Sequence, residues 1–108
     1  MTWQARSEGQ PGRTNPEELL GAAHSACYSM AFSSKLAAAG HAPESLQVTA
    51  AVTFQPGEGI TGIHLLVSAK VPGLEAEEFQ QIAEDAKATC PVSQALAGTT
   101  ITLEASLA

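Results

Sequence analysis

The stretch that decides the fold runs from residue 15 to residue 40 and reads NPEELLGAAHSACYSMAFSSKLAAAG. Asn15 suits a helix N-cap and Pro16 suits the first helical position. Two glutamates follow in the first turn, where they complement the positive end of the helix dipole. Gly40 supplies a C-terminal stop. The pattern predicts a helix over Pro16–Ala39, about 36 Å long at the usual rise per residue.

Apolar residues at helical spacing predict which side of this helix faces inward. The predicted inner stripe consists of Leu20, Ala23, Cys27 and Met30. Small residues are concentrated around Cys27, and they allow another backbone to come close. We therefore expect a tightly crossed helix partner near this cysteine.

The rest of the chain alternates between strand and helix patterns. Period-two alternation over residues 46–54 and 63–71, around a Pro-Gly turn, predicts an antiparallel hairpin. The remaining elements are expected as follows: a strand tail over Met1–Ala5, a loop over 7–14, helices over Glu75–Thr89 and Pro91–Ala97, and a last strand over 101–107.

This order of elements predicts an α+β fold, in which two main helices pack on antiparallel strands. The length of 108 residues is that of a single domain, 1–108. Because aromatic residues are only 5% of the chain, we expect a core filled by Ala, Leu, Val and Ile. Exposed strand edges and an uncovered flank of the long helix predict a partner chain.

Charge and hydropathy exclude several function classes. The chain has 5 Lys and Arg against 11 Asp and Glu, a net charge of −6. Without a basic stripe, neither nucleic acid nor an anionic membrane surface is an expected partner. No apolar run is long enough to span a bilayer, and no signal peptide is visible after Met1. We therefore expect a cytoplasmic protein.

Cys27 and Cys90 are the only cysteines, and three interpretations are open for them. They are buried and inert, they form a structural disulfide, or they are a redox pair. Cys90 precedes a helix that begins at Pro91, and the amides of a helix start stabilise a thiolate. Cys27 lies in mid-helix, so a lowered pKa there would need a cation from elsewhere, and one arginine would suffice.

Metal binding is a weaker interpretation. His24 and Cys27 lie three residues apart and share one helix face, but two ligands do not make a zinc site. His24 is expected to be a packed or hydrogen-bonded helix residue. His41 is expected in a loop, His64 on the outer strand face, and Arg13 as a solvated loop charge.

Two motifs strongly resemble those of the OsmC/Ohr family of peroxidases. They are the helix segment from Asn15 to Ala31, which contains AAHSAC, and the later segment CPVSQAL beginning at Cys90. Their spacing and the elements between them also fit, so the resemblance covers essentially the whole chain. The residues around both cysteines are similar to the OsmC branch. The resemblance implies further strands before this segment and an intertwined homodimer.

The resemblance also implies a function. Cys27 would be the peroxidatic cysteine and Cys90 the resolving cysteine, with Glu17 as the family's glutamate. Arg6 matches the family's arginine, although Ser7 stands where an aromatic residue is usual. The expected reaction is reduction of organic hydroperoxides in oxidative-stress defence, with an external dithiol as reductant and neither a metal nor an organic cofactor.

One geometric expectation does not need the family. Glu17 and Cys27 are ten residues apart on one helix, a rise of about 15 Å. They cannot share a site within one straight helix, so a shared site requires Glu17 from a second, two-fold related chain. The alternative function is that of a non-catalytic domain that binds a small ligand on the same scaffold.

Overall fold

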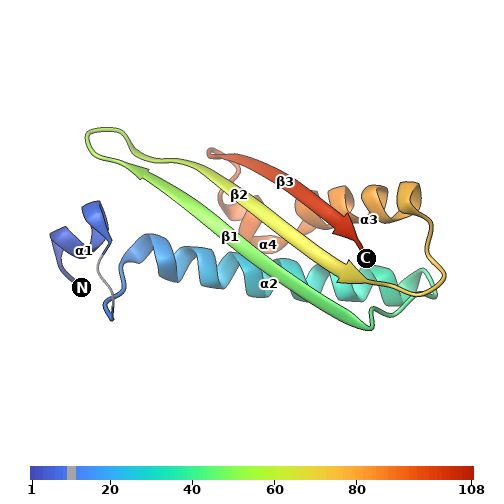
Figure 1. Cartoon of the computed structure of the whole chain (residues 1–108). Coiled ribbons are helices and arrows are strands. Elements are labelled where there is room, and N and C mark those ends of the chain that lie inside the picture. The colour runs from blue at the N-terminus through green and yellow to red at the C-terminus, as the bar shows by residue number, and fades with distance from the viewer. Residues whose placement is uncertain (10–11) are drawn as a thin grey trace.

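The computed structural model describes residues 1–9 and 12–108 and has two layers, a sheet and a set of helices packed on one of its faces (Figure 1). The thin dimension of the molecule, 18 Å, matches two layers. The elements in chain order are α1 (Trp3–Glu8), α2 (Pro16–Ala38), β1 (Ser45–Gln55), β2 (Gly59–Lys70), α3 (Ala76–Thr89), α4 (Pro91–Ala95) and β3 (Thr100–Leu107).

The long helix α2 begins as the sequence predicts. The Asn15 side chain accepts a hydrogen bond of 2.8 Å from the backbone N–H of Glu18, and Pro16 occupies the first turn. The helix ends at Ala38, one residue before the predicted end, and Gly40 follows with a positive φ of 87°. In the described part of the chain, no helix is long and apolar enough to cross a membrane.

The sheet has the order β1-β2-β3 and confirms the predicted hairpin. β1 and β2 pair antiparallel, with Val48 opposite Val67. The expectation of an all-antiparallel sheet is wrong for β3, which pairs parallel to β2 with Leu65 opposite Leu103. The physical reason is the connection: α3 and α4 lie between β2 and β3, and a helical crossover returns the chain in the same direction.

Aromatic side chains form the centre of the core, contrary to the expectation of a purely aliphatic one. Tyr28, Phe32 and Phe79 are the largest fully buried residues, and Phe32 packs against both other rings with centroids 5.5 Å apart. Leu65 and Val67 of β2 complete this cluster from the sheet. A few well-placed rings therefore fill the space between α2, α3 and β2.

The predicted inner stripe of α2 is wrong. Met30 is 74% exposed, and the buried residues are instead Glu17, Gly21, His24, Tyr28, Phe32 and Leu36. The predicted stripe was chosen from small and aliphatic residues. In the structure, the inward face of the helix instead carries the aromatic residues Tyr28 and Phe32 and the polar residues Glu17 and His24. Gly21 permits this orientation, because a Cβ there would lie 2.8 Å from the backbone oxygen of Ala50 in β1.

The N-terminal segment also differs from the prediction. Met1–Ala5 is not the tail of a strand, because residues Trp3–Glu8 form α1, which Thr2 caps by accepting a 3.0 Å hydrogen bond from the Ala5 amide. The predicted loop 7–14 therefore begins only after Glu8, and residues 10 and 11 lie outside the described residues. α1 lies beside the start of α2, near the end of β1 (Figure 1).

Candidate active site

The two cysteines meet at the middle of α2. Cys90 is the residue between α3 and α4, and its Sγ lies 3.2 Å from the Sγ of Cys27. Neither cysteine is in a disulfide, and their exposure differs: Cys90 is fully buried, whereas Cys27 is half-buried. A solute arriving from solvent therefore reaches Cys27 first.

The start of α4 favours a thiolate at Cys90. Burial acts to raise the pKa of the Cys90 thiol, but its polar neighbours, Ser93 and Val92 at the start of α4 and the Cys27 thiol, outweigh this effect. The pKa of Cys90 is therefore lowered. Amides at a helix start stabilise thiolates in this way, as the position before Pro91 suggests.

At Cys27 the effects that raise the thiol pKa are larger than those that lower it. Burial raises the pKa of Cys27, one hydrogen bond from the Val92 amide opposes the rise, and the neighbouring Cys90 adds to it. Within one chain, the Cys27 thiol is therefore harder to ionise than an ordinary cysteine. This agrees with the prediction that Cys27 needs a cation from another element before it can be a good nucleophile.

A buried polar pair adjoins the cysteines. The Nε2 atom of His24 lies 2.7 Å from the Oγ of Ser93, and both residues are buried. Burial lowers the pKa of His24, so its ring is neutral in the fold. The prediction that His24 is a packed, hydrogen-bonded helix residue is confirmed, whereas the sequence analysis did not single out Ser93.

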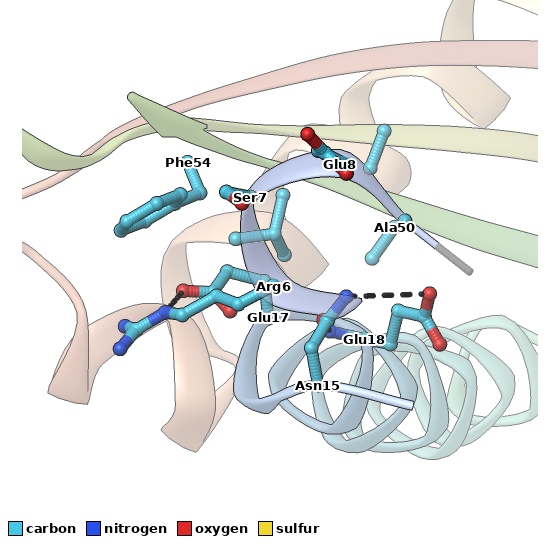
Figure 2. Close-up of a pocket in the computed structure, with 11 residues that line it drawn as sticks. Arg6, Ser7, Glu8, Asn15, Glu17, Glu18, Ala50 and Phe54 are labelled. Carbon is cyan, nitrogen blue, oxygen red and sulfur yellow. Dashed lines mark hydrogen bonds and ion pairs between the residues drawn. The ribbon is translucent and has the colours of Figure 1, made fainter. Parts of the chain in front are cut away.

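Arg6 and Glu17 form a second group at the N-terminal end of α2. Arg6 Nε donates a 2.6 Å hydrogen bond to Glu17 Oε1, and Glu17 is only 5% exposed (Figure 2). The guanidinium also lies over the ring of Phe54, 4.6 Å from its centroid. Glu17 Oε2 is buried without a hydrogen-bond partner among the described residues. The pair is thus held by contacts from α1, α2 and β1.

This ion pair lines a pocket of about 370 Å³ between α1, the start of α2 and β1. Figure 2 shows Arg6 reaching across Glu17 toward the edge of the pocket, with Phe54 above it. Apolar wall comes from Phe54, Val52 and Ala50, and no cysteine is among the described residues that line it. Phe54 was not identified from sequence, because its position in an alternating strand indicates only a side chain on the inner face.

The structure therefore separates the four predicted site residues into two pairs. Cys27 and Cys90 share one location, and Arg6 and Glu17 share another. Ten residues of α2 separate Glu17 from Cys27, which corresponds to about 15 Å of helix rise. Each chain thus carries two separate pairs of candidate site residues, which we call half-sites, at different points along the same helix.

No group of three or more His, Cys, Asp or Glu side chains in residues 1–9 and 12–108 is placed to hold a metal ion. His64 lies on the outer face of β2, as predicted, and its Nδ1 lies 2.7 Å from the Thr102 hydroxyl. Arg13 is exposed, as predicted.

Comparison with known proteins places the chain in a family. Residues 9–104 match the family described as OsmC-like protein. The chain is 50% identical over 97 residues to peroxiredoxin OsmC of Escherichia coli, an alignment that covers 87% of this chain and 67% of that protein.

Solved structures of other proteins share this fold. An OsmC-like protein from Mycoplasma pneumoniae has a TM-score of 0.81 at 17% identity, over 95% of this chain and 78% of that one. The organic hydroperoxide resistance protein OhrB of Bacillus subtilis has a TM-score of 0.68 at 25% identity, over 98% of this chain and 78% of that one. The chain belongs to the OsmC-like protein family.

Proposed function

We propose that this chain reduces organic hydroperoxides to alcohols through a sulfenic acid on Cys27 and an intramolecular disulfide with Cys90. The peroxidase class rests on the 50% identity to peroxiredoxin OsmC, and the chemistry of that class is cysteine-based. The observation that carries the proposal is the pair of reduced thiols 3.2 Å apart, one reachable from solvent and the other buried.

The reaction balances with these two residues and a dithiol. The Cys27 thiolate attacks the terminal peroxide oxygen, the O–O bond breaks, and the alcohol leaves after taking a proton. The Cys90 sulfur then attacks the sulfenic sulfur, so that an S–S bond forms, an S–O bond breaks and water leaves. An external dithiol restores both thiols by exchange and is itself oxidised to a disulfide.

Arg6 is the proposed source of the positive charge that Cys27 lacks. Its Nε donates to Glu17, and among the described residues no other hydrogen bond uses the remaining guanidinium nitrogens, which can therefore donate to a thiolate or a peroxide oxygen. Because Arg6 and Cys27 lie at different points along α2, the arginine that serves one Cys27 comes from a second chain. Glu17 fixes the orientation of Arg6 by a charge-assisted hydrogen bond.

A homodimer is supported by the surface of α2. Met30 is 74% exposed and Leu19 is 49% exposed, and exposed alanines lie between them on the same helix. A two-fold axis across this face would bring the Cys27 of one chain toward the Arg6 and Glu17 of the other. The apolar wall of the pocket, chiefly Phe54 and Val52, suits an alkyl substituent on the substrate.

The test is a dithiol-coupled assay with cumene hydroperoxide and hydrogen peroxide, accompanied by mass measurement of the protein. The proposal expects turnover, a preference for the organic substrate and loss of two mass units through disulfide formation. Cys27→Ser should abolish turnover, and Cys90→Ser should leave a sulfenic acid that dimedone traps on Cys27.

Turnover that persists in Cys27→Ser would remove Cys27 as the nucleophile. Absence of turnover in the wild-type protein, with both thiols unchanged in mass, would favour the non-catalytic ligand-binding alternative. Thr89→Ala is a control beside Cys90, because its hydroxyl donates only to the Asp85 carbonyl of its own helix, at 2.8 Å.

A further inference from the structure

We propose that Asn15 is a positioning residue for Arg6: one end of its side-chain amide caps α2, and the other end holds α1 in place. The Arg6 guanidinium is thereby kept beside Glu17. Asn15 acts on the reaction only through Arg6, so its role in catalysis rests on the proposed function. The link between the two helices is a property of the reduced chain and can be measured without peroxide.

The two ends of the Asn15 amide bind different helices. Its Oδ1 accepts a hydrogen bond of 2.8 Å from the backbone N–H of Glu18 in α2, and its Nδ2 donates one of 2.8 Å to the backbone carbonyl of Ala5 in α1. Nδ2 also lies 3.5 Å from Oε1 of Glu18 (Figure 2). Asn15 is 6% exposed and Ala5 is fully buried, so water has little access to the link.

Only one orientation of the amide satisfies both partners. A backbone N–H is a donor and a backbone carbonyl is an acceptor, so the amide oxygen must face Glu18 and the amide nitrogen must face Ala5. A flipped amide would place two donors together and two acceptors together. The cap of α2 and the link to α1 are therefore separate functions of two different atoms, and a substitution can remove one without the other.

α1 depends on such links because it is short. It has six residues, and a helix of this length is not stable in water on its own. The Ala5 carbonyl accepts a hydrogen bond from the Gly9 amide at 3.2 Å, and its second lone pair accepts the one from Asn15. On the side of β1, the rings of Trp3 and Phe54 meet edge to face, with centroids 5.8 Å apart. The Asn15 amide thus supplies a directional link to α2, beside the ring contact with β1.

Two links of different kinds then join the same two segments. The Asn15 link holds the main chain at Ala5, and the Glu17 link holds the side chain of the next residue, Arg6, through a contact of 2.6 Å. The first link fixes where the arginine side chain begins, and the second fixes its Nε. Fixing both ends removes much of the conformational freedom of a long side chain. The remaining guanidinium nitrogens are then held in one place, and small displacements of such groups are costly in rate.

Substitutions can separate the cap from the link, because Asn, Asp and Ser are similarly good N-caps. Asn15→Asp keeps an oxygen for the Glu18 amide but replaces the Nδ2 donor by a second acceptor facing Ala5. Asn15→Ser keeps a capping oxygen and adds no charge. Gln80→Glu is the matched control: Gln80 Nε2 donates to the Ala105 carbonyl at 2.6 Å, so the same change breaks the same kind of hydrogen bond between α3 and β3.

The first experiment follows the Nε–H of Arg6 by NMR in the reduced protein. The chain has only two arginines, so Arg6→Lys assigns the signal, and the exposed Arg13 is an internal reference. We expect Asn15→Asp and Asn15→Ser to speed the exchange of the Arg6 Nε–H with water about tenfold, because a buried hydrogen bond that holds α1 is lost. Gln80→Glu should leave this exchange unchanged.

The second experiment asks whether Asn15 acts through Arg6. In a Cys90→Ser background, the rate of alkylation by iodoacetamide at pH 7 reports the reactivity of Cys27. Asn15→Ser should slow alkylation several-fold when Arg6 is present and cause no further slowing in combination with Arg6→Ala, because residues that act through a shared group are not additive. Equal slowing in both backgrounds overturns the positioning role.

The outcomes separate this proposal from the proposed function. Unchanged exchange of the Arg6 Nε–H in both Asn15 variants overturns the link, even if the protein is a peroxidase. Faster exchange in Gln80→Glu, to the same extent, overturns it as well. A wild-type protein without turnover overturns the proposed function, while the exchange rates still decide whether Asn15 holds Arg6. If Asn15→Asp does not fold, as judged by circular dichroism, Asn15→Ser decides the matter.

Discussion

The Sγ atoms of Cys27 and Cys90 lie 3.2 Å apart, although 63 positions separate the two residues in the chain. Cys27 lies in the middle turns of α2. Cys90 lies between α3 and α4, directly before Pro91. A disulfide bond is about 2.05 Å long, so closure requires the sulfurs to approach by only about 1 Å. The fold thus prepares the pair for oxidation without a large rearrangement.

Oxidation of this pair should stabilise the chain. Closing a loop of this length restricts the unfolded state by about 4 kcal/mol in the chain-entropy description. We expect the peroxide-treated protein to unfold at a higher urea concentration than the reduced protein, with the gain reversed by a dithiol. Urea unfolding followed by circular dichroism measures the difference. Cys27→Ser treated in the same way is the control, and an equal shift there would contradict a disulfide origin.

Gly21 should not tolerate a methyl group. A Cβ at this position would lie 2.8 Å from the Ala50 backbone oxygen, which cannot move without displacing β1. We expect Gly21→Ala to lower the free energy of unfolding by about 1–3 kcal/mol, the usual cost of overpacking. Gly98→Ala is the matched control, because nothing lies within 4 Å of a Cβ there. Equal stability of the two variants in urea would show that α2 and β1 are less closely packed.

The extent of sequence-based prediction differs between the elements. Asn15, Pro16 and Gly40 act locally, and so the limits of α2 could be predicted to within one residue. The orientation of that helix could not, because it depends on the contact of Gly21 with β1 and on the buried pairing of His24. The direction of β3 also depends on a tertiary crossover rather than on its own alternating pattern.

In the candidate site, too, the features set by local sequence could be predicted, whereas those set by tertiary packing could not. A helix start after Cys90 is visible as Pro91, and its effect on the thiol follows from local chemistry. Ser93 meets His24 only because α4 packs on α2. The Arg6–Glu17 pair likewise depends on how α1 lies against the start of α2, which the sequence pattern did not predict as a helix.

Stability should depend on pH through His24. Burial lowers its pKa in the folded chain, whereas in the unfolded chain it titrates near the ordinary value of 6.5. Below that pH the unfolded state binds more protons than the folded state, so stability is full above pH 6.5 and falls as the solution becomes more acidic. We expect a loss of up to about 1.4 kcal/mol per pH unit below 6.5.

Urea unfolding at pH 7.5, 6.5 and 5.5 measures this loss, and His24→Gln should lack the part due to His24. His64→Gln is the matched control, because His64 is exposed on the outer face of β2. If His24→Gln and the wild-type protein lose stability in parallel over this range, His24 is not the group responsible.

The separation of the two half-sites leads to a test by complementation between chains. Arg6→Ala removes the cation from one half-site, and Cys27→Ser removes the nucleophile from the other, so each variant alone should be nearly inactive. If Arg6 acts on the Cys27 of a partner, a mixed dimer has one intact site, formed by the Cys27 of the first variant and the Arg6 of the second. Equal amounts of the two variants that exchange freely should regain about a quarter of wild-type activity, since half the dimers are mixed and each has one of two sites.

Complementation between variants is expected only if Arg6 of one chain acts on Cys27 of the other. Mixing Arg6→Ala with Glu17→Ala should restore little, because Arg6 and Glu17 belong to the same half-site of one chain, joined by a contact of 2.6 Å. In a mixed dimer of these two, each site has a defect in either its arginine or the glutamate that orients it. Activity that returns with neither mixture, in samples shown by sedimentation to be dimeric, would place Arg6 and Cys27 in the same chain. That result would require α1 to move along α2 by a distance comparable to the 15 Å or so of helix rise that separates Glu17 from Cys27.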